Sequence, residues 1–270
     1  MKPCEFLSLG YYKLIIKEPM SLPLFLVSLL LPALAQTLGQ PSGQASAPAA
    51  GQVAVVPPAS AEAVLEELKA GNKRFVDGRR TRSLLSSEDP KLRETLARGQ
   101  NPCAVIIACS DSRVGDNFIF DQELGRLFTI RQAGNSPDLQ AIASAEYAVE
   151  YLGCQVVMVL AHTSCGAVKA VADAKGTPLP GNLWAFQAAM AGLLEATPRQ
   201  PKEEHLSYYR RLERVNAMRQ AKALVHRSEL LRAKVASGKL KVVPAVYDLV
   251  SGKVIFLEEA QAEPELAQAH

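Results

Sequence analysis

The sequence lacks several features that would mark common classes of protein. Its formal net charge is only +3 over 270 residues, and no block of Lys or Arg reaches five in a row, which argues against a dedicated nucleic-acid surface. The five cysteines form an odd, sparse set without any CxxC pair, so a disulfide scaffold is disfavoured. No GxGxxG follows a candidate strand and no serine lies in GxSxG, so dinucleotide binding and serine-nucleophile chemistry are disfavoured too.

The longest apolar run, residues 21–35, is shorter than the roughly 20 residues that span a bilayer. Three lysines precede this run, and it ends in the small-x-small sequence Ala33-Leu34-Ala35. A basic flank, an apolar stretch and a cleavage site of small residues are typical of a secretory signal peptide. We therefore expect residues 1–35 to direct export to the periplasm or cell envelope. The alternative is an uncleaved membrane anchor through residues 21–35, and no other membrane contact is expected.

Residues 36–59 are rich in Pro, Gly, Ala, Ser and Gln and carry no charge, which predicts a flexible linker. The folded domain is expected over residues 60–260, with residues 261–270 as a C-terminal tail. With 48% hydrophobic residues in the chain, this domain is long enough to bury a substantial core.

Short, continuous apolar runs indicate strands that are buried on both faces. Four such strands and a hairpin partner are expected at residues 103–108, 127–130, 156–161, 239–247 and 253–257, although Pro244 weakens the fourth. Helices are expected at residues 60–76, 140–152 and 164–174. The alternation predicts an α/β fold: a mostly parallel central sheet of about four parallel strands plus an antiparallel edge strand, flanked by helices.

A charged, helical segment at about residues 183–232 interrupts this alternation. We interpret it as a solvated helical hairpin or packing insertion, with a partner-binding face as the alternative.

Two polar segments directly follow two of the buried runs. Cys109-Ser110-Asp111-Ser112-Arg113 follows the first, and His162-Thr163-Ser164-Cys165-Gly166 follows the third. Ligands of open parallel sheets gather outside the carboxyl ends of the strands, so both segments meet in one crevice if the two strands are neighbours.

The residue types in this crevice favour a metal site. Two thiolates and an imidazole, from Cys109, Cys165 and His162, suit a borderline-soft tetrahedral ion. Three protein ligands leave the fourth position to water, which favours a catalytic site over a structural one. A carboxylate fixed by an arginine can orient a reacting oxygen, so Asp111 and Arg113 are candidate catalytic residues. Two alternatives remain for Asp111. It could be an alternate fourth ligand of the metal, or it could form a purely structural ion pair with Arg113.

The paired motifs CSDSR (109–113) and HTSCG (162–166) resemble those of the β-class carbonic anhydrases. The resemblance extends to LKAGNKRFV (68–76), to FDQ (120–122) with GRLFTIRQAGN (125–135), and to YDLVSGKVIF (247–256). It covers roughly residues 61–257 apart from the helical insertion. After Arg113 the chain departs from the family, which usually has Pro and often Glu where this chain reads Val-Gly-Asp-Asn.

The resemblance implies one Zn²⁺ per subunit on Cys109, His162 and Cys165, with Asp111 and Arg113 as the orienting pair. It implies that zinc-bound hydroxide attacks carbon dioxide to give bicarbonate and a proton. It also implies a substrate pocket formed with Gly134 and three further residues that match plant-type members: Gln100, Phe128 and Tyr147. In the family this pocket is built across a dimer interface, so a homodimer or higher even oligomer is expected.

Two other functions are compatible with the same residues. A carbonyl sulfide or carbon disulfide hydrolase would use the same metal and the same Asp–Arg pair. A non-catalytic zinc-binding or scaffolding protein would need a damaged pair or a filled fourth position, and both Asp111 and Arg113 are present.

Overall fold

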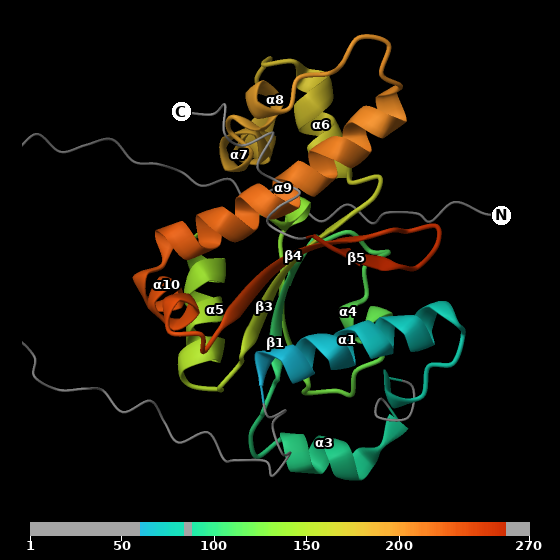
Figure 1. Ribbon diagram of the computed structural model, residues 1–270, viewed down its shortest axis with the longest axis vertical. Coiled ribbons are helices and arrows are strands. Elements are labelled where there is room, and N and C mark those ends of the chain that lie inside the picture. The colour runs from blue at the N-terminus through green and yellow to red at the C-terminus, as the bar shows by residue number, and fades with distance from the viewer. Residues whose placement is uncertain (1–59, 84–87, 258–270) are drawn as a thin grey trace, which may run out of the picture. The chain divides into compact units, whose positions relative to one another are not determined.

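The computed structural model describes residues 60–83 and 88–257 (Figure 1). Five strands form one sheet in the order β2-β1-β3-β4-β5. Their bounds are β1 Ala104–Ala108, β2 Leu127–Arg131, β3 Val156–His162, β4 Lys241–Tyr247 and β5 Val254–Phe256. The first four are mutually parallel, and β5 pairs antiparallel with β4. The predicted fold class is confirmed, including the antiparallel edge strand.

Nine α-helices and two short 3-10 turns accompany this sheet in the described residues. They are α1 Ala61–Val76, α3 Pro90–Leu96, α4 Asp116–Ile119, α5 Leu139–Glu150, α6 Gly166–Ala174, α7 Trp184–Ala189, α8 Leu193–Ala196, α9 His205–Arg227, α10 Glu229–Ala236, η1 Ala133–Asn135 and η2 Gly181–Leu183. The expected strands and helices are present with ends shifted by two residues at most. The expected insertion contains η2 and α7 to α10, so it is helical. The proposed signal peptide, the linker and the tail beyond residue 257 lie outside the described residues.

The central strands β1 and β3 are buried along their whole length, as their apolar runs predict. Alternate side chains of a strand point to opposite faces of the sheet, so each strand contributes side chains to a hydrophobic core on either face. One face packs Ile106 and Met158 against Leu68 of α1. The other packs Ile107 and Val159 with α5, α9 and α10. Figure 1 shows α1 on one side of the sheet and α5 and α10 on the other.

Pro244 is tolerated in β4 because of where β5 ends. β5 pairs only with residues 245–247, so Pro244 lies where β4 has a strand neighbour on one side, β3. Proline removes a backbone donor, which strands accept at such edge-like positions. Its carbonyl still accepts a hydrogen bond from the Leu257 N–H at 2.9 Å.

Helix α1 docks closely on the segment that follows the Cys109 turn. A Cβ atom at Gly71 would lie 1.8 Å from the Phe120 carbonyl oxygen, so only glycine permits this approach. Asn72 donates to the carbonyls of Ile119 and Gly252 and accepts from the Val254 N–H. One asparagine thereby ties α1 to both α4 and the β4–β5 hairpin.

No helix in residues 60–83 and 88–257 has both the length and the apolar character needed to cross a bilayer.

A buried carboxylate, Asp121, joins α1 to the chain after it. Its side chain is fully buried and accepts hydrogen bonds from Arg74 Nε at 2.6 Å and from the N–H groups of Thr81 and Ser83. Burial on its own would raise the pKa of Asp121, but Arg74 and the backbone donors outweigh burial and lower it. The carboxylate is therefore ionised when folded, and its contribution to stability depends on that charge.

We predict that Asp121→Asn lowers the free energy of unfolding by about 3 kcal/mol near neutral pH, because it leaves Arg74 without its buried partner. Asn tolerates the left-handed backbone at this position, where φ is 43°, so the backbone itself is not strained. Because the folded pKa is depressed, the wild-type advantage is complete above the unfolded pKa of about 3.9 and is lost as pH falls through the folded value. Urea titrations between pH 7 and pH 3 measure both effects.

The control is Asp173→Asn, which breaks an exposed pair with Lys169. Exposed pairs contribute about 1 kcal/mol at most. Equal losses of unfolding free energy in Asp121→Asn and Asp173→Asn would contradict a special contribution of the buried Arg74–Asp121 pair to stability.

Candidate metal centre

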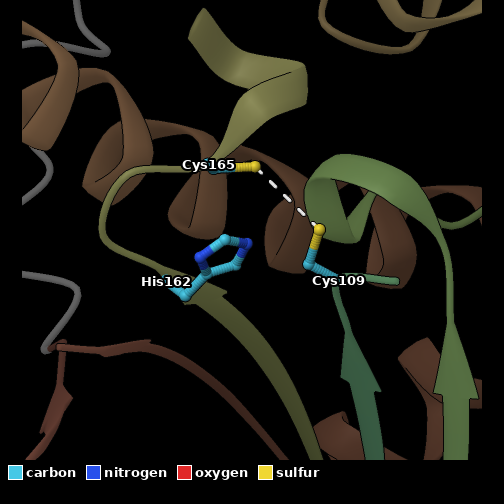
Figure 2. Close-up of side chains that lie close together, drawn as sticks. All are labelled: Cys109, His162 and Cys165. Carbon is cyan, nitrogen blue, oxygen red and sulfur yellow. Dashed lines mark hydrogen bonds between the residues drawn. The ribbon is translucent and has the colours of Figure 1, made fainter. Parts of the chain in front are cut away.

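Three potential metal ligands converge at the carboxyl ends of β1 and β3 (Figure 2). Cys109 directly follows β1, His162 is the last residue of β3, and Cys165 directly precedes α6. The two strands are paired neighbours, with Ala108 beside Leu160, so the turns after them are adjacent. The ligand atoms of the three residues lie within 4.8 Å of one another, and all three side chains are buried.

The geometry fits a tetrahedral ion of zinc size. The sulfurs of Cys109 and Cys165 are 4.0 Å apart. Two thiolates on one zinc ion, each at about 2.3 Å, lie about 3.8 Å apart. His162 places Nδ1 3.0 Å from the Thr163 carbonyl, which fixes its proton there and leaves the Nε2 lone pair available. That Nε2 is buried and has no hydrogen-bond partner among the described residues, which is the state of a ligand atom.

The two thiols share a proton in the metal-free chain. The pairing of the two sulfurs lowers the pKa of Cys109, while the same pairing and burial raise the pKa of Cys165. Burial acts to lower the pKa of His162, but the negative charge of the nearby Cys109 thiolate acts in the other direction, and the pKa is raised. A divalent cation would relieve this crowding of negative charge, because it stabilises both thiolates and the neutral imidazole.

The other two described cysteines differ from this pair. Cys103 and Cys154 are buried without a metal-ligand cluster around them, and burial raises the pKa of Cys154 to about 12. Both behave as small apolar side chains.

Asp111 and Arg113 form a two-pronged ion pair beside the cluster. Arg113 donates from Nε to one carboxylate oxygen at 2.9 Å and from Nη2 to the other at 2.7 Å. These bonds lower the pKa of Asp111 well below its usual range, so the carboxylate is ionised. Its Oδ2 is 3.9 Å from His162 Nε2, although Asp111 is not part of the three-ligand group. Arg113 Nη2 also donates to the Ser164 carbonyl and so links the two turns.

Gly134, one of the predicted pocket residues, lies against the cluster. Its N–H donates to Cys109 Sγ at 3.3 Å, which stabilises a thiolate. Its φ of 70° favours glycine, and a Cβ there would lie 2.1 Å from Met190 Cε. The backbone therefore favours glycine at this position, and any larger residue would also have to displace the end of the Met190 side chain.

The other predicted pocket residues are not near the cluster within one chain. Gln100 precedes β1, so the whole strand separates it from Cys109. Phe128 is level with Val105, four residues before Cys109, or roughly 13 Å along the sheet. Tyr147 is 39% exposed on α5, where it stacks with Tyr151.

Sequence reasoning missed three residues that hold the cysteine turns in place. Arg131, at the end of β2, donates to the carbonyls of Cys109 and Asp111. Glu213 of α9 accepts from the Cys165 N–H, and Asn216 of α9 donates to the Gly134 carbonyl. The position of Arg131 at the end of a predicted strand could have indicated that it lies near the site. The sequence of α9 gave no such indication for Glu213 and Asn216, because a charged helix can pack at many places on the fold.

Fold and site together define an α/β metalloenzyme with a Cys-His-Cys ligand set. A protein-family model described as carbonic anhydrase matches residues 104–254. The chain is 36% identical to carbonic anhydrase 2 of Mycobacterium tuberculosis over 195 residues, which cover 72% of this chain and 91% of that relative. This chain belongs to the β-class carbonic anhydrase family, and the predicted enzyme class, a carbonate dehydratase, is confirmed.

Solved structures agree with this assignment. The β-carbonic anhydrase CafA of Aspergillus fumigatus matches with a TM-score of 0.58 and 28% identity, over 76% of this chain and 96% of that one. Two tetrameric β-carbonic anhydrases of Sordaria macrospora are represented by a chain that matches with a TM-score of 0.56 and 20% identity, over 72% of this chain and 96% of that one. The second likeness supports the fold alone.

Proposed function

We propose that this chain catalyses the reversible hydration of carbon dioxide to bicarbonate and a proton, with one Zn²⁺ per subunit on Cys109, His162 and Cys165. The observation that carries the proposal is the buried group of two sulfurs and an unpartnered imidazole nitrogen, which suits zinc in both spacing and donor chemistry. When bound, the ion supplies Lewis acidity and lowers the pKa of a coordinated water.

The chain's own residues orient the reaction. The ionised Asp111 carboxylate, held by Arg113, accepts a hydrogen bond from the attacking oxygen and aims its lone pair at the carbon of the substrate. Because Arg113 occupies both carboxylate oxygens, Asp111 serves better as an acceptor than as a fourth ligand. An intact Asp–Arg pair beside an open position also argues against a non-catalytic zinc protein.

We propose that the substrate pocket is completed in a homodimer or a higher even oligomer. β2 is an edge strand of the sheet, and α5 packs on it. The outer surface of α5 exposes Leu139, Tyr147 and Tyr151, an apolar surface of the kind that covers protein interfaces. A second copy seated there would bring Phe128 and Tyr147 toward its own metal site.

We propose further that residues 1–35 are a signal peptide and that the enzyme works in the periplasm or cell envelope. The support is the basic flank, the 15-residue apolar run at 21–35 and the Ala-Leu-Ala exit.

The test of function is zinc analysis together with carbon dioxide hydration for the wild type and Asp111→Asn. We expect about one zinc per chain in both proteins and a fall in hydration of about 100-fold or more in the variant, because Asn cannot accept the proton of the attacking oxygen as a carboxylate does. The matched control is Asp89→Asn, an exposed helix cap that Asn replaces equally well.

Wild-type activity in Asp111→Asn would refute the role of the carboxylate. A wild type that holds no zinc, or that does not hydrate carbon dioxide, would refute the function. Turnover of carbonyl sulfide and carbon disulfide is measured in parallel, and faster sulfide release than hydration would assign the hydrolase instead.

The assembly is tested with Tyr147→Arg, which places a charge on the outer face of α5. We expect the wild type to have at least twice the mass of one mature chain by light scattering. The variant should shift to the monomer and lose most hydration while it keeps its zinc. Val250→Arg, at the 90% exposed turn between β4 and β5, should keep the wild-type mass. A monomeric, fully active wild type would contradict a shared pocket.

Export is tested by fractionating bacteria that express the full chain. We expect the mature protein in the envelope fraction with Gln36 as its first residue. Arginines at Leu29 and Leu30 should retain it in the cytoplasm, because they interrupt the apolar run, whereas Gln40→Arg should not. An intact chain that sediments with membranes would favour the anchor.

A further inference from the structure

Helix α9 carries a row of buried polar side chains on one face. Glu213, Asn216 and Gln220 are 1%, 1% and 7% exposed, and their spacing of three and four residues aligns them along the helix. Buried polar groups are unfavourable unless they are hydrogen-bonded, so the partners of this row identify what the helix is built to hold. In Figure 2 a helix in the colour of α9 passes behind the three ligands.

Glu213 holds the turn that carries Cys165. Its Oε1 accepts the Cys165 N–H at 2.8 Å, at the start of α6. Cys165 is the N-cap residue of α6 and provides no side-chain cap of its own. The first N–H groups of a helix need acceptors, and a carboxylate there is also favoured by the helix dipole. Glu213 thus fixes the backbone of Cys165 from another helix, at the point where α6 begins.

Asn216 holds the turn that lies against Cys109. Its Nδ2 donates to the Gly134 carbonyl at 2.9 Å, and the N–H of the same glycine donates to Cys109 Sγ. Gln220 donates to Asn216 Oδ1 at 3.2 Å and to the Ala189 carbonyl at 2.8 Å. These bonds fix the orientation of the Asn216 amide, so that its N–H₂ group faces Gly134.

We propose that Glu213 and Asn216 are positioning residues that clamp the two cysteine-bearing regions from a single helix and hold their sulfurs at the spacing of a shared ion. The inference rests on the proposed function for the identity of that ion. It gives the helical segment at 183–232 a definite role, because α9 acts as the frame of the metal centre. It also gives the buried Glu213 carboxyl group a structural purpose, because one of its oxygens accepts the Cys165 N–H.

The experiment measures zinc affinity in the full chain by competition with a chromophoric chelator. Loss of an outer partner of a metal ligand typically lowers metal affinity by about 10- to 100-fold. We expect a loss of this size in Glu213→Leu and in Asn216→Leu, which keep the volume but remove the hydrogen bond. Glu213→Gln should lose less than Glu213→Leu, because its amide oxygen still accepts the Cys165 N–H.

Cobalt substitution supplies a second readout that does not depend on activity. The sulfur-to-cobalt charge-transfer absorption reports how well the thiolates reach the ion, and it should weaken in both leucine variants and persist in Glu213→Gln. Circular dichroism of the metal-free proteins shows whether each variant folds. If a leucine variant does not fold, Glu213→Ala or Asn216→Ala replaces it, because each also removes the hydrogen bond, and wild-type zinc affinity in the alanine variants would overturn the clamp.

The matched control is Ser228→Ala. Ser228 is also buried and polar, but it caps α10 and donates to Glu146, away from the cysteines. It should lower the melting temperature of the metal-free protein without changing zinc affinity.

Wild-type zinc affinity in both leucine variants would overturn the clamp and leave the proposed function intact. A Glu213→Gln loss as large as that of Glu213→Leu would overturn the hydrogen-bond role of Glu213. A wild type without measurable zinc affinity would overturn the function and the clamp together.

Discussion

The parallel pairing of β1 with β3 is the constraint on which the metal centre depends. Because Ala108 lies beside Leu160, β1 and β3 end at nearly the same level, and the turns that follow them lie side by side. Two thiols 56 positions apart in the chain are thereby brought to 4.0 Å. The pairing is in turn fixed by two apolar faces, since a slip of one residue would turn every core side chain of a strand to the other face.

The fold and the ligands were predictable because their signals are local. The apolar runs of β1 and β3 are buried on both faces, and the polar residues begin where each run stops, so the cysteine and histidine positions followed from the strand ends. The prediction for β4 was weaker, since Pro244 is unfavourable in a central strand and only the short reach of β5 makes it acceptable.

The supports of the site were not predictable, because they depend on where a helix docks. Nothing in the pattern of α9 shows that Glu213 is buried, and its many charges suggest a solvated surface instead. The same holds for Phe128 and Tyr147, whose distance from Cys109 within one chain follows from strand register and from the outward face of α5. A resemblance transfers residue types, whereas the docking of strands and helices decides where those residues lie relative to the site.

The position of α9 late in the chain has a consequence for what counts as the minimal unit of this centre. The three proposed ligands lie within residues 109–165, so a fragment that stops before α9 would contain all of them. In that fragment the Cys165 N–H would lose its acceptor Glu213, and the Gly134 carbonyl would lose Asn216 and keep only the Ser136 hydroxyl as a donor. A transplant of this centre into another scaffold therefore has to bring a helix that the ligand motif does not include.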